Sequence, residues 1–246
     1  MTEKSFAEAA AADSLAENLA RVEETIADAC RAAGRERGQV RLLAVSKTVP
    51  PERINAAIAL GVRQIGENRV QEFLAKKPAL NLTGIGTHLI GHLQTNKVRQ
   101  IVGQVDMIES VDSLHLAQQI SRVSVERGLV TQALVEVNIG GEEAKSGISP
   151  DSLEELLTQI APLPGIRVRG LMTVPPILAS ESEKRQVFSK MYRLFVDIRT
   201  KKIDNIDMHE LSMGMSGDFR EAILEGATIV RVGSAIFGAR HYPAHG

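Results

Sequence analysis

The alternation of hydrophobic and polar residues predicts one long helix at the start of the chain. Five apolar residues recur at spacings of three and four, which places them on one helix face: Leu15, Leu19, Val22, Ile26 and Cys30. Ser14 is the expected N-terminal cap of this helix, and Gly34 is its expected stop. We therefore expect residues 1–12 to form a disordered tail outside the folded domain.

Eight short runs rich in apolar and β-branched residues follow and predict strands. They span residues 40–47, 62–68, 87–93, 105–111, 132–139, 166–174, 206–214 and 227–234. An amphipathic stretch follows each of the first seven runs, and such alternation implies parallel strands joined by right-handed crossovers. Eight units of this kind close into a (β/α)8 barrel, which we expect as a single TIM-type domain of the α/β class over residues 1–246.

The main alternative is an open, doubly wound sheet. That fold would carry a Gly-rich dinucleotide-binding turn after its first strand, and this turn is missing here. Only AIFGARHYPAHG follows the eighth predicted strand, so the last helix of the barrel is expected to be truncated. We expect the N-terminal helix to cover the wall that a full last helix would shield.

Composition and charge exclude several classes of function. The 246 residues include 29 Lys plus Arg and 30 Asp plus Glu, a net charge of −1, so no basic field would attract nucleic acid. No apolar run approaches the ~18 residues of a membrane span, and the N-terminus is not that of a signal peptide. A single cysteine and scattered histidines predict no disulfide and no metal site. We expect a cytoplasmic monomer that binds a small molecule.

Two turns rich in glycine and serine predict a phosphate site. Barrels often bind phosphate in the loops after strands 7 and 8, and the segments there read SMGMSGD and RVGSAIFG. Glycine lets backbone N–H groups approach an anion, and serine hydroxyls add further donors. Either turn alone would fit an ordinary strand-to-helix connection, but the two together favour phosphate.

Lys47 ends the first predicted strand and points into the expected barrel mouth. To form an imine, its amine must be neutral, which at an ordinary pKa holds for about 1 lysine in 2,500 at pH 7. Arg231, near the end of the strand that closes against the first, is the expected cation that lowers this pKa. A reactive lysine beside a phosphate site predicts an aldehyde-bearing phosphate ligand, either pyridoxal 5′-phosphate (PLP) or a phosphosugar.

Several segments make the sequence resemble the PLP homeostasis protein family, also called the proline synthetase co-transcribed homologue family. The most specific of these segments are AVSK, HLIGHLQTNK and SMGMSGD. The resemblance covers nearly the whole chain and implies a (β/α)8 barrel like the N-terminal domain of alanine racemase. One departure is Arg69, where the family often has tyrosine.

The resemblance also implies roles for individual residues. Lys47 would hold the cofactor as a covalent aldimine, and Asn68 would lie beside it. The phosphate would be bound by Ser212 or Ser216 together with Gly233 and Ser234. Arg231 would face the pyridine nitrogen. The implied function is intracellular vitamin B6 homeostasis, with PLP-dependent apo-enzymes as partners that receive the cofactor.

We expect a binding protein without turnover rather than an enzyme. A racemase needs acid/base groups on both faces of the substrate α-carbon, and the second base of alanine racemase comes from another domain. The candidates here are weak: Tyr192 lies on an outer helix, Tyr242 in the C-terminal tail, His209 inside the barrel, and His92 at a strand end. A slow amino-acid racemase is one alternative, and a Schiff-base aldolase using Glu67 is the other.

Overall fold

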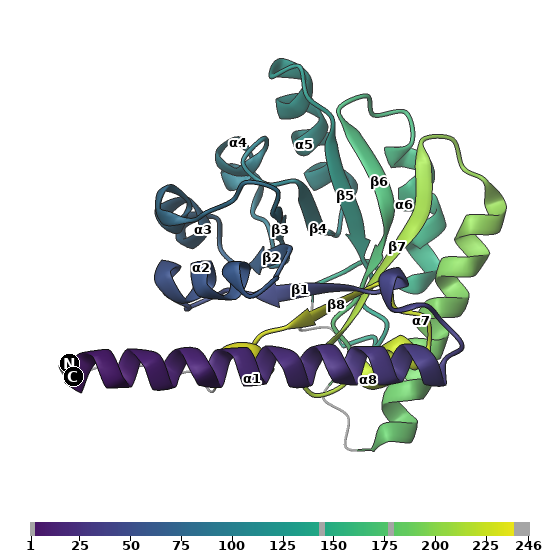
Figure 1. Cartoon of the computed structure of the whole chain (residues 1–246). Coiled ribbons are helices and arrows are strands. Elements are labelled where there is room, and N and C mark those ends of the chain that lie inside the picture. The colour runs from purple at the N-terminus through teal and green to yellow at the C-terminus, as the bar shows by residue number, and fades with distance from the viewer. Residues whose placement is uncertain (1–2, 143–145, 177–179, 239–246) are drawn as a thin grey trace.

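The strands of the chain close into a barrel in sequence order, which confirms the predicted (β/α)8 architecture (Figure 1). The computed structural model describes residues 3–142, 146–176 and 180–238. Each neighbouring pair is parallel, and β1 pairs with β8 to complete the ring. The strands are β1 (Arg41–Val45), β2 (Gln64–Glu67), β3 (Gly86–Leu89), β4 (Met107–Val111), β5 (Thr131–Glu136), β6 (Ile166–Met172), β7 (Ile206–Met215) and β8 (Ile229–Val232).

A helix follows every strand, and the one after β8 is a single short turn, as expected. The α-helices are α1 (Glu3–Ala32), α2 (Pro51–Ala59), α3 (Val70–Lys76), α4 (Val98–Ile101), α5 (Leu114–Glu126), α6 (Leu153–Ile160), α7 (Glu181–Lys201), α8 (Phe219–Leu224) and α9 (Ser234–Phe237). Four 3-10 helices complete the described elements: η1 (Arg37–Gln39), η2 (Lys77–Ala79), η3 (Thr95–Lys97) and η4 (Pro150–Ser152). None of the helices in these ranges is long and apolar enough to cross a membrane.

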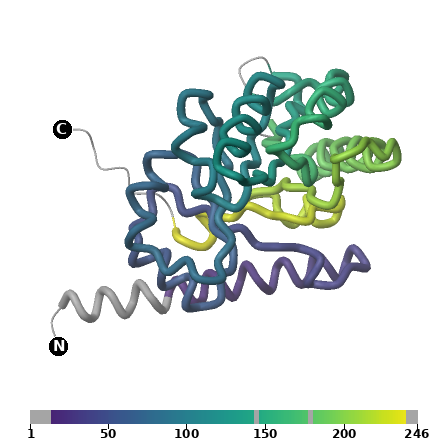
Figure 2. The backbone as a smooth tube through the Cα atoms, turned by 90° about the horizontal axis from the view of Figure 1, so that it is seen from above, coloured from purple at the N-terminus to yellow at the C-terminus, as the bar shows by residue number. Residues whose placement is uncertain are grey.

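Helix α1 covers the barrel wall beside β8, where a full last helix would otherwise lie. It packs against α8 and α9, and the Asn18 side-chain amide donates a hydrogen bond of 3.0 Å to the Ile236 carbonyl (Figures 1 and 2). All five apolar residues predicted for its inner face are buried. The helix begins at Glu3 rather than near Ser14, so it runs through most of the segment expected to be a disordered tail. The alanine-rich sequence there has high helix propensity and continues the helix.

The barrel has an apolar outer layer and a mixed interior. One large core lies between the strands and the surrounding helices, and a separate small cluster contains Met107, Leu134 and Met172. Residues two apart on a strand face the same side, so Glu109 shares the face of Met107 and Glu136 shares the face of Leu134. The interior therefore carries buried carboxylates above its apolar layer.

Strands β6 and β7 leave no room for a side chain at Gly170. A methyl group built on Gly170 would lie 1.8 Å from the Glu210 carbonyl oxygen. The pairing register of the two strands also shifts between Val168 and Gly170. Glycine is required here because any side chain would push the two strands apart.

We predict that Gly170→Ala destabilises the barrel by about 3 kcal/mol, the upper range for overpacking in a core. The measurement is urea-induced unfolding followed by circular dichroism. Gly38→Ala is the matched control, because nothing lies within 4 Å of a methyl group at Gly38, and it should change stability by less than about 0.5 kcal/mol. Equal unfolding midpoints for the two variants would contradict this account.

Candidate functional site

A cavity of about 330 Å³ lies at the C-terminal ends of the strands, and it brings together six of the seven residues predicted for the site. This volume is at the small end of the usual range for ligand pockets. The predicted residues in its wall are Lys47, Asn68, Ser216, Arg231, Gly233 and Ser234. The remaining described wall residues are Val45, Ile90, Val174, Met215 and Gly217. Ser212 is the predicted residue that is not among them.

The backbone just before Lys47 is fixed by buried polar contacts from β2 and α3. Ser46 is fully buried, and its hydroxyl donates to Glu67 Oε1 at 3.0 Å. Lys76 Nζ donates to the Ser46 carbonyl at 2.9 Å and to Glu67 Oε1 at 2.8 Å. Burial raises the pKa of the Glu67 carboxyl, and the hydrogen bond from Lys76 opposes that rise. These contacts hold the lysine-bearing loop against the end of the barrel.

The residue after Lys47 has a backbone conformation that is unusual for a side chain with a branched Cβ. Thr48 has a φ of 64°, in the left-handed region. Its backbone N–H donates to the Glu72 carboxylate, which also pairs with Lys76 at 2.6 Å. The strained turn is therefore tied down by α3, and residues outside the cavity set the direction in which Lys47 leaves the strand.

Arg231 is held by a chain of buried polar groups beneath the cavity. Its Nη1 donates to Ser212 Oγ at 2.7 Å, and its Nη2 donates to the Thr173 carbonyl at 2.8 Å. Ser212 Oγ in turn donates to Glu109 Oε2 at 2.6 Å, and Glu109 Oε1 lies 2.6 Å from His88 Nδ1. Burial lowers the pKa of Arg231, whereas the nearby Glu109 carboxylate raises it. A guanidinium stays protonated, so Arg231 presents a fixed cationic donor to the cavity.

The two candidate serines have different places in the structure. Ser216 lines the cavity, and its hydroxyl oxygen accepts backbone N–H groups from Gly233 at 3.1 Å and Ala235 at 3.3 Å. Ser216 thus joins the turn after β7 to the turn after β8, the two segments predicted to cradle phosphate. Ser212 is completely buried in the chain of contacts that supports Arg231.

Asn68 supplies an observation in favour of a bound polar ligand. Its side-chain oxygen is buried and has no hydrogen-bond partner within the described part of the chain, although Asn68 lines the cavity. Buried polar atoms are nearly always paired, so an orphaned acceptor on a residue of the cavity wall fits a site that a ligand completes. Asn68 follows β2 directly, so it lies next to the end of β1 that leads to Lys47.

Sequence reasoning missed Glu109 and His88, which complete the support for Arg231. Glu109 is fully buried in the strand MIESV, and His88 is 4% exposed in β3. A charged residue in the middle of an apolar strand was a usable signal, because burying an unpaired charge is costly. The partner of that charge depends on barrel closure and was not visible in the local pattern.

The described fold and site define a class: barrels of the alanine racemase N-terminal type. The family model for the alanine racemase N-terminal domain matches residues 10–241. An alanine racemase from Clostridium difficile shares the fold at a TM-score of 0.67 with 18% identity, over 94% of this chain and 58% of the racemase.

More similar relatives identify the family within that class. A pyridoxal phosphate homeostasis protein from Aquifex aeolicus is 46% identical over 226 residues, which cover 92% of this chain and 98% of the relative. The Pseudomonas aeruginosa protein of the same name is 40% identical, over 94% and 97% of the two chains. PipY of Synechococcus elongatus, solved with PLP bound, has a TM-score of 0.79 and 34% identity, over 91% of this chain and all of PipY. The chain belongs to the pyridoxal phosphate homeostasis protein family.

A further carboxyl group, that of Glu136 at the end of β5, has a pKa far above its ordinary value. Burial raises the pKa of Glu136 to about 7, and the nearby Asp112 carboxylate adds to this effect. Arg231 and His92 act in the opposite direction but are outweighed. Glu136 is 8% exposed, so water screens it poorly.

The raised pKa of Glu136 predicts a pH dependence of stability. The ordinary pKa of 4.5 applies to the unfolded chain, so between pH 4.5 and about 7 the folded state keeps a proton that the unfolded state releases. Stability from this group is therefore present at low pH and falls as pH rises through that window, by up to about 3 kcal/mol. Glu136→Gln should remove the decline and stabilise the protein at pH 8.

The measurement is urea unfolding at several pH values between 4.5 and 8. Exposed Glu52→Gln is the control and should keep the slope of the unsubstituted protein. Parallel curves for the unsubstituted chain and Glu136→Gln would show that Glu136 does not titrate in this way.

Proposed function

We propose that this chain holds PLP covalently on Lys47 as a Schiff base and stores it for release to other proteins. The observation that carries the proposal is that Lys47, Arg231 and the turns holding Ser216 and Gly233 all line one cavity. The family relation supports it, because a relative has been solved with PLP bound. When bound, the cofactor supplies an aldehyde that condenses with a neutral amine, and one water leaves.

The residues of the cavity fit the parts of this cofactor. The Ser216 hydroxyl suits a phosphate, because its oxygen accepts the Gly233 and Ala235 N–H groups and its proton is left to be donated to an anion. The orphaned Asn68 oxygen would accept a hydrogen bond from the ligand. Val45, Ile90, Val174 and Met215 supply apolar wall for a flat ring.

Arg231 is proposed to face the pyridine nitrogen. Because a guanidinium only donates hydrogen bonds, it would leave that nitrogen unprotonated and make the ring a weaker electron sink. The chain of Ser212, Glu109 and His88 keeps Arg231 in place for this role.

The cavity also favours storage over racemisation. Lys47 and Arg231 are the only ionisable side chains among the described residues of its wall. His92 is 54% exposed and pairs with Asp112 at 3.4 Å, and Tyr192 lies 40% exposed on α7. His209 was expected inside the barrel, but it is 66% exposed and pairs with Asp207. Tyr242 lies outside the described residues.

The carboxylate expected for a Schiff-base aldolase, Glu67, does not line the cavity. Glu67 is 1% exposed, and its Oε1 is engaged by Ser46 and Lys76 outside the cavity wall. A Schiff-base aldolase needs an acid/base group beside its lysine, and Glu67 contacts the loop backbone instead.

We further propose that the released cofactor reaches PLP-dependent apo-enzymes, because such enzymes are the proteins that use it. The cytoplasmic location and the monomeric state stay predictions. The proposed storage role requires only that the Lys47 bond be reversible.

The covalent step is tested with borohydride, which reduces a Schiff base to a stable amine. After incubation with PLP and reduction, the intact mass should rise by one reduced cofactor, and peptide mapping should place it on Lys47. Lys47→Ala should abolish the increase, whereas Lys190→Ala, an exposed lysine on α7, should not. Undiminished modification of Lys47→Ala would overturn the assignment.

The roles of Ser212 and Ser216 are distinguished by comparing the binding of PLP with that of pyridoxal, which lacks the phosphate. Ser216→Ala should weaken the binding of PLP about tenfold, which corresponds to the loss of one hydrogen bond to a charged group. The affinity for pyridoxal should stay nearly unchanged. Ser212→Ala should weaken both ligands to the same degree, because it acts through Arg231. Absorbance titration gives the dissociation constants, and a phosphate-selective effect of Ser212→Ala alone would reverse the assignment.

A further inference from the structure

A second cavity, of about 240 Å³, adjoins the cofactor cavity near the start of α2 and the end of α9. The two cavities share four wall residues: Val45, Lys47, Gly233 and Ser234. The rest of the second wall consists of Thr48, Val49, Pro50, Arg53, Phe237 and Gly238. We call this space the Arg53 cavity.

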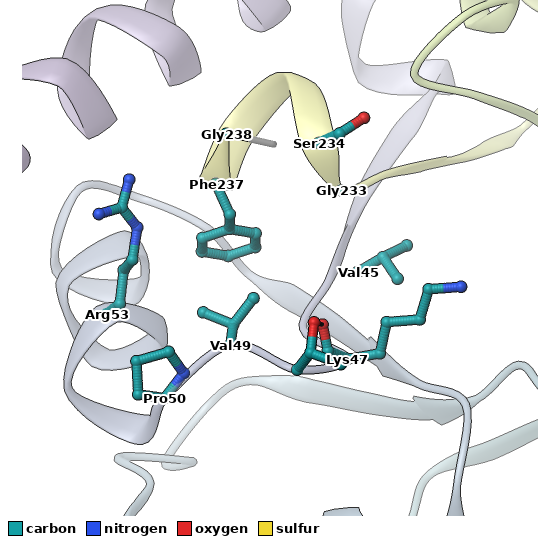
Figure 3. A pocket seen from close by; sticks show the side chains of 10 residues that line it. Val45, Lys47, Val49, Pro50, Arg53, Gly233, Ser234, Phe237 and Gly238 are labelled. Carbon is teal, nitrogen blue, oxygen red and sulfur yellow. Dashed lines mark hydrogen bonds between the residues drawn. The ribbon is translucent and has the colours of Figure 1, made fainter. Parts of the chain in front are cut away.

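The Arg53 cavity has its charged group away from the groups proposed to hold PLP. Figure 3 shows that the Lys47 ammonium and the Ser234 hydroxyl both point away from Arg53 and Phe237. The Phe237 ring lies between Arg53 and Val45 in the same view. The groups proposed to hold PLP thus face one side of the shared wall, and Arg53 lies on the other.

Arg53 carries an unsatisfied donor in this cavity wall. Its Nε is buried from solvent and has no hydrogen-bond partner in the described part of the chain. The described wall contains no aspartate or glutamate that would neutralise the guanidinium. A buried, unpaired N–H of a charged group costs free energy unless a ligand or water pairs with it.

The remaining wall indicates which anion would fit. Nε and a neighbouring guanidinium nitrogen form a planar fork that matches the two oxygens of a carboxylate. Val45, Val49, Pro50 and Phe237 give the same cavity an apolar surface. A volume of about 240 Å³ is below the usual range for ligand pockets and limits the ligand to a small molecule.

We propose that the Arg53 cavity binds a small carboxylate with an aromatic or branched apolar body. The carboxylate pairs with Arg53, and the apolar body contacts Phe237 and Val49. Because the cavity shares the loop of Lys47 and the start of α9 with the cofactor cavity, occupancy of one changes affinity for the other. This coupling rests on the proposed PLP function, whereas the carboxylate site itself does not.

The test is isothermal titration calorimetry on the full chain, with and without PLP, using benzoate as the probe. Benzoate should bind one site at least tenfold more tightly than acetate, which lacks the apolar body, and than benzyl alcohol, which lacks the charge. Benzoate should bind both the PLP-loaded and the unloaded chain, with a different dissociation constant for each.

Variants assign the site. Arg53→Gln should weaken benzoate at least tenfold, and Arg53→Lys, which keeps the charge but loses the fork, at least threefold. Arg63→Gln is the matched control, since Arg63 is exposed and lines a different cavity. If Arg53→Gln does not fold, Arg53→Lys decides the assignment.

Three results would overturn the site. They are no saturable benzoate binding, an affinity for benzoate in the Arg53 variants equal to that of the unsubstituted chain, or complete loss of benzoate binding when PLP is loaded. The last result would place benzoate in the cofactor cavity. PLP loading is read separately by absorbance and should be normal in Arg53→Gln. If PLP loads neither the unsubstituted chain nor the Arg53 variants, the proposed function is refuted. The benzoate titrations of the unloaded chain still test the Arg53 cavity in that case.

Discussion

The site depends on the burial of one cation, Arg231, inside the barrel. A guanidinium removed from water is tolerated only when its charge and donors are matched, and Glu109 supplies that match through Ser212. With His88, which contacts Glu109, these groups come from β3, β4, β7 and β8, so they meet only when the barrel is closed. Closure of the fold and construction of the site floor are therefore one event.

The mouth of the barrel is organised from its periphery. The lysine-bearing loop is held by carboxylates and a lysine from β2 and α3, and the anion cradle is held by one serine between two turns. Neither set of contacts requires a ligand. A site whose donors already have their positions pays little to order them on binding, which suits a protein that takes up and releases the same molecule.

The repeating units of the fold could be predicted from the sequence because parallel strands covered on both faces have nearly continuous apolar runs. Lys47, Asn68 and Arg231 lie at or near strand ends, where the barrel concentrates chemistry, so their convergence followed from topology and the family resemblance. The division of labour between Ser212 and Ser216 did not follow, because it depends on a register shift between Ser212 and Met215. The orientation of His209 and the unpaired Arg53 nitrogen also depend on side-chain placement that the one-dimensional pattern does not carry.

The packing of α1 has a consequence for the order of assembly in the cell. This helix leaves the ribosome well before its partners α8 and α9, which lie far along the chain, and β1 must likewise await β8. Synthesis proceeds at about 5–20 residues per second, so the apolar face of α1 is without its native cover for many seconds. A nascent chain of this topology exposes that face until α8 and α9 have emerged, which makes α1 a segment for chaperones to protect during synthesis.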